Sequence, residues 1–157
     1  MISVIPVTPD FGAVIGNVDL SAPLDDESFA AIEGAFNRYA VLVFHHQPLT
    51  EDQQNAFARR FGPLGTPIAP FRPAGTDRLA RPESADISNV DEHGNVLREG
   101  DARLLITRAN ALWHTDSTFK RVPAKMSMLC AQAVAVTGGE TEFADMRAAW
   151  DALADTR

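Results

Sequence analysis

Apolar residues in the first part of the chain change from strand-like to helix-like spacing. Short apolar runs over residues 2–7 and 13–20 surround a turn at residues 9–12, and this pattern predicts two strands. Apolar positions then recur every three or four residues, which predicts a helix that begins after Asp25 or Asp26. The apolar stripe of this helix consists of Phe29, Ile32, Ala35, Phe36 and Tyr39.

The next two elements are a short strand and a capped helix. Residues 41–44 form an apolar run that is too short for a helix and rich in β-branched side chains, so they predict a buried strand. Thr50 and Gln53 match the capping box that opens many helices, and Gly62 with Pro63 predicts where this helix ends.

The second half of the chain reads mainly as strands. A Pro- and Gly-rich stretch over residues 65–82 has no periodicity and predicts a long functional loop within one domain. A turn at residues 91–95 predicts a hairpin, and the other expected elements are strands over 85–90, 109–119 and 126–136, a turn at 137–139 and a helix over 146–154. The expected fold class is α+β with a mainly β core.

His114 and Asp116 stand two residues apart within the predicted strand 109–119. Side chains two positions apart lie on the same face of a strand, whereas on a helix they would point about 200° apart and could not share one ion. The motif therefore requires an extended backbone. With the His and Asp content of this chain, about 0.3 such pairs are expected by chance, so the pair alone is weak evidence for a metal site.

Composition limits the partners and the location. The formal net charge is −7 and no basic block occurs, so neither nucleic acid nor an anionic membrane is an expected partner. Cys130 is the one cysteine, which excludes an intrachain disulfide, and its apolar surroundings predict a small buried side chain. Because the N-terminus lacks signal-peptide features and no segment has the length of a membrane span, a cytoplasmic location is expected.

Two segments closely resemble the taurine dioxygenase and 2,4-dichlorophenoxyacetate dioxygenase family, nearer its phenoxyacetate branch. They are Ala109–Phe119 (ANALWHTDSTF) and Gly138–Phe143 (GGETEF), and residues 41–44, 53–62, 86–90 and 145–149 resemble the same family. The resemblance implies a double-stranded β-helix, or jelly roll, with flanking helices. It also implies an enzyme that uses Fe(II), 2-oxoglutarate and O2.

The family's site residues carry over to four positions. His114 and Asp116 match the first two members of a 2-His-1-carboxylate iron site. Thr141 matches the threonine whose hydroxyl binds the distal carboxylate of 2-oxoglutarate. Asn110 matches a substrate-contacting asparagine, although capping the start of the motif strand is an equally good interpretation. Trp113 is interpreted as a packing residue.

The second histidine of the family site and the arginine that binds 2-oxoglutarate belong to the C-terminal half of the fold, which this sequence does not reach. His45 and His46 are interpreted as surface or rim residues, His93 as an exposed turn residue, and Arg147 as a solvated side chain. The resemblance implies a small organic anion as substrate. Candidates for the cation that holds it are Arg72, Arg78, Arg81, Arg103 and Arg108.

The sequence thus predicts a single, apparently truncated dioxygenase domain over residues 1–157. Its expected reaction hydroxylates a phenoxyalkanoate-like or sulfonate-like anion and releases succinate and CO2. The alternative is a catalytically incomplete fragment or a non-catalytic binding remnant, which would expose strand edges and could associate with further copies. A zinc site is weaker because two protein ligands are too few. A hydrolase using His114, Asp116 and Ser117 is weaker still, because neighbours on one strand cannot face one another as a triad.

Overall fold

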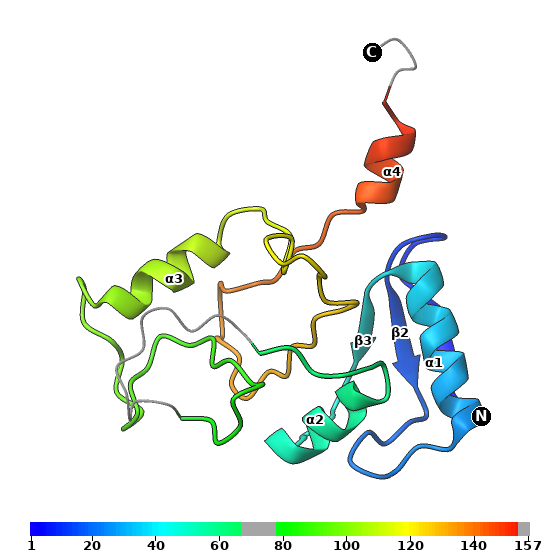
Figure 1. Cartoon of the computed structure of the whole chain (residues 1–157), viewed down its shortest axis with the longest axis horizontal. Helices are drawn as coiled ribbons and strands as arrows, with labels where there is room; N and C mark the ends of the chain where they lie inside the picture. The colour runs from blue at the N-terminus through cyan, green and yellow to red at the C-terminus, as the bar shows by residue number, and fades with distance from the viewer. Residues whose placement is uncertain (67–77, 154–157) are drawn as a thin grey trace. The chain divides into compact units, whose positions relative to one another are not determined.

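Three strands near the N-terminus form a sheet (Figure 1). In the computed structural model, which describes residues 1–66 and 78–153, β1 (Ser3–Pro6) pairs antiparallel with β2 (Ala13–Gly16). β2 pairs in parallel with β3 (Leu42–Phe44), which gives the order β1-β2-β3. All three strands lie where the sequence predicted them, although each is shorter than its apolar run.

Helix α1 (Asp26–Tyr39) connects the parallel strands β2 and β3. The side chain of Asp25 caps its start by accepting the backbone N–H of Ser28 at 2.7 Å. This hydrogen bond lowers the pKa of Asp25 from its usual range. The predicted helix and its cap are both confirmed.

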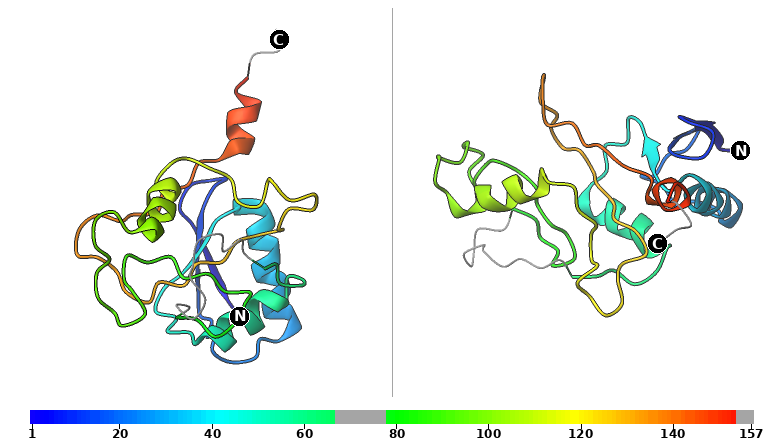
Figure 2. Two further views of the ribbon diagram at one scale, coloured as in Figure 1. Left: turned by 60° about the vertical axis from the view of Figure 1, so that its left-hand side comes forward. Right: turned by 90° about the horizontal axis from the view of Figure 1, so that it is seen from above.

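The helix packs against the sheet through its predicted apolar stripe (Figures 1 and 2). Ile32, Ala35 and Tyr39 on α1 are buried, and so are Ala13 and Ile15 on β2. Ile32 is the largest side chain in the described part of the chain that is fully removed from solvent. The hydrophobic contact between α1 and β2 is therefore the core of this part of the molecule.

Helix α2 (Glu51–Arg59) begins with the predicted capping box. The backbone N–H of Thr50 donates to Oε1 of Gln53 at 2.9 Å, and the backbone N–H of Gln53 donates to Oγ1 of Thr50 at 3.3 Å. These reciprocal bonds satisfy two donors that the first turn of a helix leaves free.

The chain divides into two units, which we call unit 1 (Met1–Gln53 with Cys130–Arg157) and unit 2 (Gln54–Leu129). Unit 2 contains α3 (Ala102–Asn110), and unit 1 ends with α4 (Met146–Asp151). α4 confirms the predicted C-terminal helix in shortened form. α3 was not predicted.

The strands predicted over residues 109–119 and 126–136 are wrong, since residues 111–145 contain neither strand nor helix (Figure 2). An extended segment becomes a strand only when a neighbouring strand pairs with its backbone N–H and C=O groups. In the described residues these segments have no such partner. The predicted hairpin around residues 91–95 is reduced to one bridge, between Val90 and Val96.

Two residues predicted to be buried or packed are not buried. Trp113 is 70% exposed, and Cys130 is half-buried with its Sγ accepting the side-chain amide of Gln132. Both lie in the segments that form no sheet, so no second layer covers them. The predicted loop over residues 65–82 lies largely outside the described residues. None of the helices in residues 1–66 and 78–153 combines the length and hydropathy that a bilayer crossing requires.

Candidate metal centre

The His-x-Asp motif follows the end of α3 in unit 2. Asp101 caps α3 by accepting the backbone N–H of Arg103 at 2.9 Å, and the helix ends at Asn110. The chain then turns over residues 116–119, with Ser117 at a φ of 63°. His114 and Thr115 therefore lie in a segment without strand or helix that leads into this turn, rather than in the strand that the sequence predicted.

His114 and Asp116 nevertheless face each other. Nε2 of His114 lies 3.5 Å from Oδ1 of Asp116, and about half of each side chain is exposed. Imidazole nitrogen and carboxylate oxygen ligands bind divalent ions at about 2.0–2.2 Å, so this separation leaves room for one ion that both atoms contact. The predicted proximity of the two side chains is present in the structure, although no strand produces it.

A backbone carbonyl orients the histidine ring. Nδ1 of His114 lies 2.7 Å from the carbonyl oxygen of Leu112. Because a carbonyl oxygen only accepts, this contact assigns a proton to Nδ1 and, in the neutral ring, leaves the lone pair on Nε2. This nitrogen then faces the carboxylate of Asp116, and a cation between them would contact both groups.

A hydroxyl orients the carboxylate. Oγ of Ser127 donates to Oδ2 of Asp116 at 2.7 Å, on the oxygen that does not face His114. Such a bond restricts the rotation of the carboxylate and leaves Oδ1 available to an ion. Sequence reasoning missed Ser127, whose only signal is its place as one of two polar residues in the apolar run 126–136.

Replacing Ser127 with alanine is expected to weaken Mn(II) binding by about 10- to 100-fold, because Asp116 loses the hydrogen bond that orients it. Isothermal titration calorimetry measures the change. Ser117→Ala is the matched control, since it removes a hydroxyl next to Asp116 for which no contact with the carboxylate is seen. Equal affinities for Ser127→Ala and the unmodified chain would contradict the orienting role.

The candidate site groups two side chains that could bind a metal. Within residues 1–66 and 78–153, no three His, Cys, Asp or Glu side chains come together as a metal site. His45 and His46 are exposed, as expected, and the side chain of His93 is 76% exposed in its turn. The donor pair fits a divalent ion but requires further ligands, from solvent, co-substrate or protein.

The other two predicted site residues are also exposed. Asn110 is the last residue of α3, four positions before His114, and not the first residue of a strand. Thr141 belongs to unit 1 and follows Gly138 and Gly139, whose φ angles are 77° and 78°. Residues other than glycine rarely adopt such angles, so the two glycines fit the predicted turn before Thr141.

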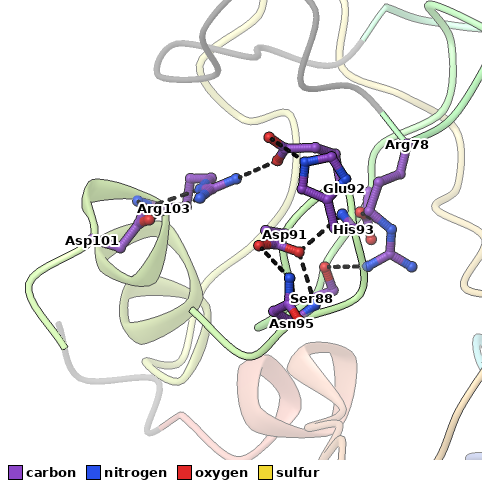
Figure 3. Close-up of polar contacts among 9 residues, drawn as sticks. Arg78, Ser88, Asp91, Glu92, His93, Asn95, Asp101 and Arg103 are labelled. Carbon is purple, nitrogen blue, oxygen red and sulfur yellow. Dashed lines mark hydrogen bonds and ion pairs between the residues drawn. The ribbon is translucent and has the colours of Figure 1, made fainter. Parts of the chain in front are cut away.

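Carboxylates neutralise two of the arginines that could hold an anionic substrate (Figure 3). Arg103 donates to Asp101 at 2.8 Å and to Glu92 at 3.3 Å, and its hydrogen bonds lower the pKa of Asp101 to about 2. Arg78 lies 3.5 Å from Asp86. The charges of Arg78 and Arg103 are thus compensated within unit 2, which makes them poor candidates for the substrate anion. Arg72 lies outside the described residues.

Known proteins share this arrangement of sequence and fold. The chain is 45% identical over 150 residues to the alpha-ketoglutarate-dependent 2,4-dichlorophenoxyacetate dioxygenase of Cupriavidus pinatubonensis, covering 94% of this chain and 51% of that protein. It is 43% identical over 150 residues to the (S)-phenoxypropionate/alpha-ketoglutarate-dioxygenase of Sphingobium herbicidovorans, covering 94% of this chain and 46% of that protein.

A solved structure extends the likeness to the fold. The crystal structure of AAD-2 in complex with Mn(II) and N-oxalylglycine matches with a TM-score of 0.81 at 40% identity, covering 99% of this chain and 50% of that one. N-oxalylglycine is an analogue of 2-oxoglutarate, which is also called alpha-ketoglutarate. The chain spans about half the length of the relatives it matches.

These relatives define a class, the dioxygenases that depend on 2-oxoglutarate. The model of the taurine catabolism dioxygenase TauD, TfdA family matches residues 3–157, and the chain belongs to this family. Members of the family use Fe(II), 2-oxoglutarate and O2. The resemblance recognised in the sequence is confirmed.

Proposed function

We propose that this chain provides the first two iron ligands of an Fe(II)- and 2-oxoglutarate-dependent dioxygenase. The observation that carries the proposal is the 3.5 Å separation between Nε2 of His114 and Oδ1 of Asp116. The proton on Nδ1 of His114 directs the other ring nitrogen toward the ion. We propose a small organic anion as the substrate, and the printed names of the relatives favour a phenoxyalkanoate over a sulfonate.

Each residue has a separate role in this proposal. His114 and Asp116 hold the ion, while the carbonyl of Leu112 and the hydroxyl of Ser127 fix their orientation. The hydroxyl of Thr141 donates to the distal carboxylate of 2-oxoglutarate, and Asn110 contacts the substrate. When bound, Fe(II) with 2-oxoglutarate and O2 supplies the oxidising power for hydroxylation of a C–H bond, with succinate and CO2 as the other products.

We further propose that both units belong to one dioxygenase domain with a jelly-roll core in the whole protein. The continuous match of one family model over residues 3–157 supports this proposal, because the match spans both units. The net charge of −7 supports small molecules, rather than nucleic acid or membranes, as partners. We also propose a cytoplasmic location and association between copies of this chain.

An anaerobic titration tests the function. Adding 2-oxoglutarate to the protein with Fe(II) is expected to produce a visible charge-transfer band if His114 and Asp116 hold the ion and the co-substrate binds to it. Admitting O2 with a phenoxyacetate should then release succinate and a phenol in equal amounts, because hydroxylation of the ether carbon would give a hemiacetal that splits into the phenol and an oxoacid. Thr141→Val should weaken the band at limiting 2-oxoglutarate.

The same titration distinguishes the enzyme from the second candidate function, a binding module that does not turn over substrate. That candidate is favoured by the presence of only two grouped protein ligands in residues 1–66 and 78–153. A band without succinate would support the binding module. If neither a band nor metal binding occurs, the iron proposal is wrong for this chain.

A further inference from the structure

The C-terminal end of α1 has an incomplete set of hydrogen bonds within its own neighbourhood. The last four carbonyls of a helix have no partner inside the helix. In α1, the carbonyl of Phe36 accepts the backbone N–H of Ala40 at 2.8 Å, and the carbonyl of Tyr39 accepts those of Val41 at 2.7 Å and Gly12 at 2.9 Å. The carbonyls of Asn37 and Arg38 accept from a distant side chain instead.

That side chain is the guanidinium of Arg147, which is 49% exposed, so the predicted exposure is present, but which also has protein partners that the sequence did not indicate. Its Nη1 donates to the carbonyls of Arg38 at 3.0 Å and Asn37 at 3.5 Å, and its Nη2 donates to the carbonyl of Asp10 at 3.1 Å. Nε donates to the carboxylate of Asp145 at 3.1 Å. The planar, five-donor guanidinium thus joins α4 to the end of α1 and to the turn between β1 and β2.

The charge of Arg147 suits this position. The C-terminal end of a helix carries a partial negative charge, which a cation stabilises. Asp145, on the other side of the guanidinium, has a pKa lowered first of all by its hydrogen bond from Arg147. All these groups belong to unit 1. We call them the Arg147 anchor, which consists of Arg147, Asp145 and the carbonyls of Asp10, Asn37 and Arg38.

The Arg147 anchor attaches α4 to the rest of unit 1, which the packing of α4 alone does not do. α4 has six residues and buries none of them, and an isolated helix of this length is not stable in water. Thr141 lies six positions before Arg147, in a segment without helix or strand. Six residues of extended chain span up to about 20 Å, so without a fixed point Thr141 could occupy many positions.

We propose that Arg147 is a positioning residue, which fixes the segment that carries Thr141 by binding the end of α1. This inference rests on the proposed function, in which the Thr141 hydroxyl meets a carboxylate of 2-oxoglutarate. Productive binding sites hold their groups within about 0.5 Å, and a segment anchored at one end moves much less than a free one. Arg147 acts through Thr141 and does not itself contact the co-substrate.

NMR relaxation of the ¹⁵N-labelled chain tests the anchor directly. In Arg147→Ala, the order parameters of the backbone amides of Thr141 and Ala149 should fall from about 0.85 to below about 0.6. Arg147→Lys should give intermediate values, because an ammonium group keeps the positive charge but cannot donate to several separate acceptors in one plane as a guanidinium does. Arg98→Ala is the matched control, since Arg98 is an exposed arginine in unit 2. Unchanged order parameters in Arg147→Ala would overturn the proposal.

Calorimetry with Mn(II) and then 2-oxoglutarate separates positioning from general loss of structure. Arg147→Ala should raise the Kd for 2-oxoglutarate by about 10- to 100-fold and leave the Kd for Mn(II) unchanged. If the anchor loosens but the affinity for 2-oxoglutarate is retained, the positioning role is wrong. If the unmodified chain with Mn(II) does not bind 2-oxoglutarate, the proposed function fails, and the order parameters still decide whether Arg147 holds the Thr141 segment.

Discussion

Replacing His114 with alanine is expected to weaken Mn(II) binding by more than about 100-fold. The variant removes one of the two proposed ligand atoms, which lie 3.5 Å apart. Residues that only orient a metal ligand already contribute about 10- to 100-fold to affinity, and loss of the ligand itself should cost more. Mn(II) is a suitable probe because it resists oxidation in air and occupies the related AAD-2 structure.

His93→Ala is the matched control for this experiment. His93 belongs to the same unit and its side chain is 76% exposed, so its loss should leave the Mn(II) affinity unchanged. Circular dichroism of both variants establishes that they fold alike. Equal Mn(II) affinity for His114→Ala and the unmodified chain would exclude His114 as a ligand and remove the main support for the iron proposal.

Replacing Ile32 with alanine is expected to lower the free energy of unfolding by about 2–5 kcal/mol. Ile32 is fully buried where α1 packs against the sheet, and the shortened side chain leaves a cavity that close-packed neighbours fill only in part. Because small domains are stable by about 5–15 kcal/mol, this single change removes a large fraction of the total. Urea denaturation measures it as a lower midpoint.

Ile5→Ala deletes the same atoms at a position that is 58% exposed, on β1. It should change the free energy of unfolding by no more than about 0.5 kcal/mol. Ile32→Val removes a single methylene and should cost about 0.5–1.5 kcal/mol. A loss below 1 kcal/mol for Ile32→Ala would mean that α1 is not packed on the sheet as described.

The elements that sequence reasoning predicted correctly are those with local signals. Asp25 indicates the start of α1, and Thr50 with Gln53 indicates the start of α2. These signals can be read from the sequence because a capping residue and its partner lie within three residues of each other. The strands over 109–119 and 126–136 were wrong because a strand is made by its pairing partner, which an apolar alternation does not provide. α3 also has a local signal, the cap at Asp101, but no element was predicted over residues 98–108, and the strand predicted over 109–119 overlaps only the last two residues of this helix.

In the candidate site, too, contacts between residues close in sequence were predicted, and contacts between distant residues were not. The spacing of His114 and Asp116 was sufficient to predict that they meet, since the contact spans two residues. The Ser127 hydroxyl lies eleven residues from Asp116, and the carbonyls that bind Arg147 lie more than one hundred residues before it. Nothing in the pattern of a short helix indicates such partners, so Arg147 was assigned to solvent by default.

The distance of the Arg147 anchor along the chain also has a consequence for folding. The contact between Arg147 and the carbonyl of Asp10 closes a loop of 137 residues, and long loops are costly to close early. During synthesis from the N-terminus, the carbonyls of Asn37 and Arg38 lack this partner until residue 147 has been made. The anchor should therefore form after the transition state for folding, so that losing it speeds unfolding and leaves the folding rate almost unaltered.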